Sequence, residues 1–136
     1  MFTQGDLIYA KTRASLIESG GLVEVSEMAR EAGFTVPVGV TRAVWNQYVV
    51  PDKSLRKWGQ SEEGRLWDVL YMLHDTLQQS RSVTHYYGET ITFSLYFLMP
   101  RKRSRPRHDL VALQAVMGEA DPEGSPAITI SLIGED

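Results

Sequence analysis

The sequence predicts an α+β fold, in which a three-stranded antiparallel meander in the C-terminal half packs against about four helices. Two observations lead to this prediction. Apolar residues recur every three or four positions over about residues 6–80, and at every second position over about residues 90–133. A chain of 136 residues has the length of one domain, so we expect a single domain over residues 1–136 with one hydrophobic core.

Capping residues place the four helices. Residues that favour helix starts stand at Asp6, Ser26, Thr41 and Ser61. The first three helices should end at Gly20, Gly33 and Pro51. The fourth, about residues 62–79, is the longest, and its predicted apolar stripe is Leu66, Trp67, Leu70, Leu73 and Leu77.

The segments between the helices are predicted to be extended or irregular. Residues 22–25 are long enough only for an edge strand or an extended linker, and Pro37 favours an extended backbone over residues 34–40. Residues 51–60 combine proline, glycine and scattered charge, which is typical of a loop.

The period of two defines the strands of the meander. Ile91, Phe93, Leu95 and Phe97 should face the core while the residues between them face outward. The same alternation recurs over residues 111–117 and 128–132, with short connections that favour antiparallel neighbours. One face of this sheet must be covered, and the helices are the elements that can cover it.

Composition limits the classes of protein. The chain has no cysteine, which excludes disulfides and thiolate metal sites, and no segment approaches the roughly 20 apolar residues that span a bilayer. The N-terminal residues also lack the pattern of a signal peptide. We therefore expect a soluble cytoplasmic protein that does not contact a membrane.

A basic tip, residues 101–108, interrupts an otherwise acidic chain. Its five cations leave nine lysine and arginine residues against seventeen acids elsewhere. Such a tip can neutralise phosphates of a nucleic acid, and it can equally be a solvated hairpin end that discourages edge pairing. The candidate phosphate contacts are Arg101, Lys102, Arg103, Arg105, Arg107 and His108.

Three apolar residues are candidates for a protein interface. Trp58 follows Arg56 and Lys57 in the predicted loop, where an exposed tryptophan would anchor a partner, although packing under the loop is the alternative. Tyr96 and Leu98 fall on the outward side of their strand, which is more apolar than a water-facing surface requires. Either helices cover both sheet faces or the protein forms a homodimer.

Motifs for chemistry are weak. The chain contains no HExxH, GxSxG, Walker A or GxGxxG motif, so we expect no catalytic residue, cofactor site or metal site. His74 is interpreted as a packed residue at the edge of the core. A helix-turn-helix over residues 28–45 and a calcium loop over residues 118–124 match their patterns only in part.

Three stretches of the chain resemble a known family. They are DLIYAKTRASLIESGGLVEVSEMAREAGFTVPVGVTRAVW, EEGRLWDVLYML and DLVALQAVMGEADPEGSPAITISLIGED. The chain is similar in these stretches to small uncharacterised bacterial proteins, a domain of unknown function carried on plasmids, phages and integrative elements. The resemblance implies an accessory role on mobile DNA, and it assigns no functional residue.

Three functions follow as hypotheses. The first is a non-catalytic accessory protein of a mobile element that binds a protein partner of unknown identity. The second is nucleic-acid binding through the basic tip. The third is a small enzyme without a recognisable motif, for which the sequence offers only His74 with Asp75, and the pair Glu62 and Glu63.

Overall fold

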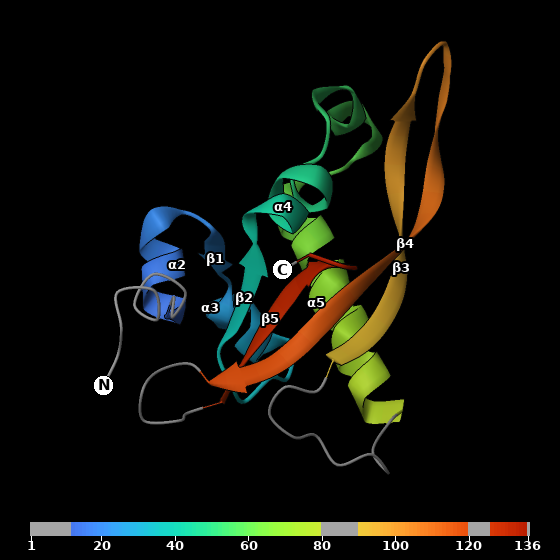
Figure 1. The fold of residues 1–136 in the computed structure, drawn as a ribbon. Coiled ribbons are helices and arrows are strands. Elements are labelled where there is room, and N and C mark those ends of the chain that lie inside the picture. Colours follow the sequence, from blue (N-terminus) through green and yellow to red (C-terminus); the bar gives the residue numbers. More distant parts are fainter. Residues whose placement is uncertain (1–11, 80–89, 120–125, 136) are drawn as a thin grey trace.

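A five-stranded mixed sheet with helices packed against it confirms the predicted α+β class (Figure 1). The computed structural model describes residues 12–79, 90–119 and 126–135. In order across the sheet, the strands are β1 (Leu22–Glu24), β2 (Val38–Thr41), β5 (Pro126–Leu132), β4 (Ser104–Glu119) and β3 (Thr90–Arg101). The helices are α2 (Arg13–Ser19), α3 (Ser26–Glu31), α4 (Arg42–Val44) with its π-helical continuation η1 (Trp45–Val49), the 3-10 helix η2 (Lys53–Trp58) and α5 (Glu62–Gln79).

The predicted meander forms one half of this sheet. β3 pairs antiparallel with β4, and β4 pairs antiparallel with β5. Phe93, Leu95 and Phe97 of β3 are buried, while Thr92, Ser94 and Tyr96 between them are exposed, as their alternation predicts. The buried face packs against α5, whose Leu66, Leu70 and Leu73 are also buried.

The other half of the sheet goes beyond the three predicted strands. β1 pairs antiparallel with β2, and β2 pairs in parallel with β5, so that the second and the last described strands meet in the middle of the sheet. β1 has three residues and β2 has four, too few to show an alternation of apolar and polar residues in the sequence. Val38, Gly39 and Val40 are all buried, which removes the alternation altogether.

Most helix ends agree with their capping residues. The backbone N–H of Ser15 donates to Thr12, Val44 donates to Thr41 and Gly64 donates to Ser61 through their side-chain oxygens. Gly20 closes α2 in the left-handed conformation, as predicted. The predicted start of that helix at Asp6 lies outside the described residues.

The predicted role of Ser26 as a helix cap is wrong. Its hydroxyl makes no capping bond to α3; it accepts a hydrogen bond from the backbone N–H of Val38 at 3.0 Å and donates to Glu24. The side chain therefore connects β1 with β2 instead of closing a helix end. The pairing of β2 with β1 also excludes the helix-turn-helix interpretation, because residues 38–41 form a strand where the second helix would lie.

Residues 51–60 are more regular than the predicted loop. Asp52 accepts a hydrogen bond from the backbone N–H of Ser54, Gly59 ends η2 in the left-handed conformation, and Leu55 is fully buried. Trp67 is a second correction, because it is 38% exposed and not part of the core stripe. Arg65 and Val69 occupy the buried positions on that side of α5.

No helix among the described residues is long and apolar enough to cross a membrane. The predicted calcium-loop pattern depends on residues 120–124, which lie outside the described part of the chain.

Candidate nucleic-acid interface

The β3–β4 hairpin extends past the rest of the sheet. β5 pairs with β4 only from Leu113 to Glu119, so the stretch of β4 from Ser104 to Ala112 has β3 as its sole strand partner among the described residues. We call this two-stranded ribbon, residues 94–112, the arm. At about 3.3 Å per residue, Ser104 to Ala112 spans roughly 30 Å. Figure 1 shows the arm rising beyond the body of the molecule.

The basic segment is mostly strand, whereas the sequence predicted a hairpin tip over residues 101–108. Arg101 pairs with Ser104, so only Lys102 and Arg103 form the turn. Pro106 is tolerated inside β4 because the outer edge of this strand carries no neighbour here, and proline cannot donate a ladder hydrogen bond. The predicted tip of residues 101–108 is therefore a two-residue turn flanked by paired strands.

Arg103 adopts an unusual backbone conformation at this turn. Its φ is 57°, and it is the only non-glycine residue with positive φ in the described chain. The left-handed region costs a side-chain-bearing residue about 1–2 kcal/mol, which is why glycine or asparagine normally occupies it. An arginine at this position gives up local stability and places a cation at the far end of the arm.

The cations of the arm are mostly without carboxylate neighbours. Arg101 forms an ion pair with Asp109 across the hairpin. Within the described residues, Lys102, Arg103, Arg105 and Arg107 have no carboxylate at ion-pair distance, and all four are exposed. His108 is exposed as well. The arm thus presents to solvent four positive charges that have no carboxylate partner in the described part of the chain.

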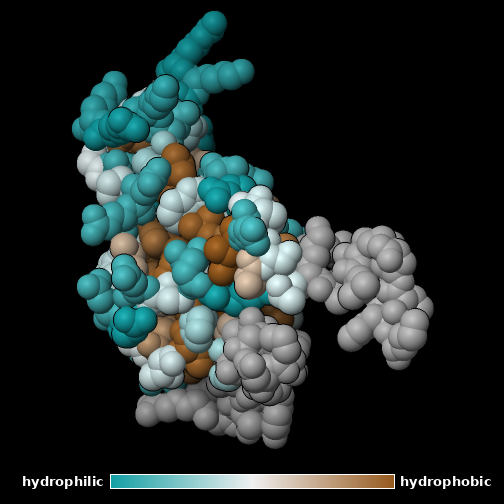
Figure 2. Space-filling view, turned by 90° about the vertical axis from the view of Figure 1, so that its left-hand side faces the viewer, coloured by the Kyte–Doolittle hydropathy of each residue, from teal (hydrophilic) through white to brown (hydrophobic). Residues whose placement is uncertain are grey.

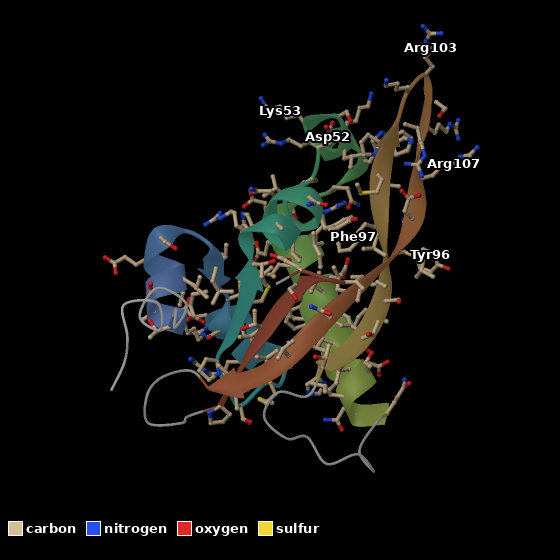
Figure 3. The ribbon with its side chains drawn as sticks, viewed as in Figure 1. Asp52, Lys53, Tyr96, Phe97, Arg103 and Arg107 are labelled. Carbon is tan, nitrogen blue, oxygen red and sulfur yellow. The ribbon has the colours of Figure 1, made fainter. Side chains whose placement is uncertain are left out.

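A second basic element lies beside the arm. η2 packs against β3, and its cations are Lys53, Arg56 and Lys57. Together the two elements hold eight of the fourteen lysine and arginine residues of the chain. Figure 3 shows Arg103 at the end of the arm, Arg107 on its flank and Lys53 on η2, all directed away from the body. In Figure 2, hydrophilic side chains project from this end of the molecule.

Arg65 holds the β3 strand of the arm at Leu98. It is 3% exposed, and its guanidinium donates to the backbone carbonyls of Tyr48 at 2.6 Å and Leu98 at 2.9 Å, and to the side-chain oxygen of Gln60 at 2.9 Å. Burial lowers the pKa of Arg65, and nearby Asp68 opposes that shift. One buried side chain therefore connects α5, the end of η1 and the edge of β3.

Sequence reasoning missed this anchor. Arg65 stands one helical turn before Val69, and both are buried. A cation at the apolar spacing of a helix normally indicates a solvated edge of the stripe. In the sequence, only the four-residue spacing between Arg65 and Val69 indicates that Arg65 lies on the buried side of the helix.

The predicted interface residues lie on η2 and β3. Trp58 is 45% exposed on η2, and Tyr96 is 63% exposed on the outward face of β3. Leu98 is only partly exposed, because Arg65 contacts the strand at this residue. Trp58 and Tyr96 are therefore both exposed, and they belong to two different elements.

His74 packs against the core edge as expected. Its ring meets that of Phe34 edge-on, with centroids 5.4 Å apart. His85 lies outside the described residues. In the parts of the chain that the structure describes, no three histidine or acidic side chains come together as a potential metal site.

Comparisons with known proteins give no relative. No family model, no curated protein and no solved structure matches the chain. The resemblance to the mobile-element family stays a prediction, and functional arguments depend on the geometry of the chain itself.

Proposed function

We propose that the protein binds nucleic acid through the arm. The observation that supports this most strongly is a projecting two-stranded ribbon with four exposed cations that lack carboxylate partners in the described chain. Phosphate contacts with lysine and arginine dominate the affinity of proteins for nucleic acids. The arm supplies such contacts at a distance from the acidic body.

The dimensions of the arm suit a duplex. The major groove is about 12 Å wide and admits a two-stranded β-ribbon. An arm of roughly 30 Å can follow the groove or reach across the backbone. η2 packs against β3, and its Lys53, Arg56 and Lys57 can contact flanking phosphates.

Base readout by the arm should be limited to guanine. Four of its five cations are arginines, which can bind guanine edges as well as phosphates, and its tip carries no asparagine or glutamine that would read adenine. The acids elsewhere repel a polyanion, so they confine contact to this end of the molecule. Glu62 and Glu63 follow η2 closely, and for this reason we expect η2 to contribute less than the arm.

The test is a salt titration of binding to duplex DNA, single-stranded DNA and RNA. Each phosphate contact on duplex DNA adds about −0.9 to the log–log salt slope, so four contacts give about −3.6 and eight about −7. Replacing Arg101, Lys102, Arg103, Arg105 and Arg107 by alanine should abolish most of the slope. Equal, weak binding by the native protein and this variant would reject the proposal.

A matched pair of single variants sharpens the test. Arg105→Ala and Arg30→Ala each remove one exposed cation, from the arm and from α3 respectively. Arg105→Ala should reduce the magnitude of the slope by about 0.9, whereas Arg30→Ala should leave it unchanged. The same effect of both variants would indicate a dependence on net charge alone.

A protein partner is the second proposed function. Exposure of 45% for Trp58 supports an anchor on η2, as aromatic residues of this kind dominate many interfaces. The accessory role on mobile DNA has only the resemblance in its support. The enzyme hypothesis gains nothing from the geometry, since His74 packs against Phe34.

A further inference from the structure

The lower part of β3 is an open sheet edge. β3 is the last strand in the sheet order, and no described strand pairs with its outer side. Arg65 donates to the carbonyl of Leu98 from that side, so the backbone groups of Leu98 point outward. Because backbone direction alternates along a strand, the N–H and C=O groups of Tyr96, Ser94 and Thr92 also point outward.

This edge lacks the usual protection. Thr90 to Met99 contains no charged residue and no proline. The opposite edge, β1, has only three residues and ends at Glu24, and the end of β3 beyond Met99 carries a register shift and the arm's cations. Natural proteins protect free edges with such features, and a long uncharged edge favours pairing with another strand.

Exposed aromatic and aliphatic side chains surround the same edge. A pocket of about 280 Å³ is lined by Asp68, Tyr71 and Met72 of α5 and by residues 94–96 with Leu110 of the hairpin. Trp67 lies one helical turn before Tyr71 on the same side of α5, and Leu110 is paired with Tyr96. Of the six exposed large hydrophobic residues in the described chain, four belong to this edge: Trp67, Tyr71, Tyr96 and Leu110.

We propose that a second copy of this chain occupies the edge, with the two β3 strands paired antiparallel about a two-fold axis near Ser94. The outward residues are then self-complementary, since Thr92 of one copy faces Tyr96 of the other. Trp67 and Tyr71 of each α5 come to lie beside the new interface, which buries apolar surface on both sides of the joined sheet.

The charges of the molecule are compatible with this arrangement. The paired segment is uncharged, so the copies meet without like-charge repulsion. Antiparallel pairing directs the two arms to opposite ends of the dimer, which separates their cations by more than the length of β3. An acidic peptide suits the edge less well because Asp68 lines the pocket.

Cysteine cross-linking tests the pairing directly, because the natural chain has no cysteine. Ser94→Cys should form reducible covalent dimers under mild oxidation, since directly paired residues have Cα atoms about 5.5 Å apart, within disulfide range. Thr92→Cys and Tyr96→Cys detect a register centred on either of those residues.

Ala112→Cys is the matched control. Ala112 is exposed on the same sheet face and pairs with Ser94, but it lies one strand inward. Its distance to its own copy would be roughly 15 Å, beyond the 7 Å limit for a disulfide. Cross-linking at Ser94, Thr92 or Tyr96 well above that at Ala112 supports the dimer. Equal yields at all four positions would overturn it.

Light scattering over a concentration series provides the second measurement. The native protein should have the mass of a dimer, and Ser94→Lys should weaken association at least tenfold by bringing two ammonium groups together at the axis. Ile133→Lys, at an exposed apolar residue outside the edge, should leave the dimer intact. A native monomer at every concentration would reject the proposal. These outcomes are independent of nucleic-acid binding, because mass and cross-linking are measured without nucleic acid and every natural cation of the arm is kept.

Discussion

The guanidinium of Arg65 lies 5.0 Å from the centroid of the Phe97 ring, so the buried cation meets an aromatic face. Tyr48 stacks against the same ring, with centroids 5.1 Å apart and planes inclined by 25°. The oxygens that accept its hydrogen bonds are neutral backbone and amide oxygens. A cation–π contact and three hydrogen bonds therefore compensate for its burial.

Arg65→Met should destabilise the fold by about 3 kcal/mol. Methionine fills similar space, but it leaves the carbonyls of Tyr48 and Leu98 without the guanidinium donor, and hydrogen bonds to charged groups contribute about 1.5–3 kcal/mol. Urea unfolding measures the change, with exposed Gln78→Met on the same helix as the control. A loss below about 1 kcal/mol would mean that the anchor matters little.

Arg103→Gly should separate stability from binding. Glycine relieves the left-handed strain at φ 57°, so we expect a gain of about 1 kcal/mol in the free energy of unfolding. Removing the cation should weaken duplex binding and lower the salt slope by about 0.9. Lys102→Gly, the neighbouring turn residue, removes an equal charge without positive φ and should not stabilise. A stability gain in both variants would contradict the strain argument.

Gly33→Ala should destabilise by about 2 kcal/mol or more. Gly33 has φ 106°, and an added Cβ would lie 2.8 Å from Nε2 of His74. Thermal or urea unfolding will detect this loss. Gly118→Ala is the control, because its Cβ would meet no atom within 4 Å, and the change should be below about 0.5 kcal/mol.

Glu24→Gln should reduce stability at neutral pH but not in acid. Burial opposes ionisation of Glu24, yet hydrogen bonds from Arg13 and Ser26 outweigh it and hold the pKa below its ordinary value. The carboxylate thus stabilises the fold above its unfolded pKa, and this contribution is lost as pH falls through the folded pKa. Unfolding free energies of both proteins from pH 7 to pH 3 should converge. A constant difference would assign the effect to packing.

The sequence predicted those helices and strands that are long enough to show several repeats of the apolar spacing. β3, β4 and β5 each carry several alternating residues, and α5 has more than four turns of helical spacing. The pairing of β2 with β5 could not be predicted, since Val38 and Ile128 are far apart in the chain and β2 is too short for a periodic signal.

The sequence predicted the positive charge of the candidate interface, but it did not predict the projecting shape of the arm. Five adjacent cations are visible in the sequence, but their reach depends on where β5 stops pairing with β4. The position of η2 against β3 was not predicted, because the two elements are distant in sequence and meet only after packing. Arg65 was missed because burial of a cation depends on carbonyls from two other segments.

β5 lies between β2 and β4 in the sheet, although it follows every other described strand along the chain. During synthesis, the β1–β2 pair and the β3–β4 hairpin cannot be joined by strand hydrogen bonds until residues 126–132 of β5 have left the ribosome. Until then β2 and the inner edge of β4 expose unpaired hydrogen-bonding groups. Folding of the sheet should therefore be late and concerted, and nascent chains that stop before residue 126 should be readily digested by proteases.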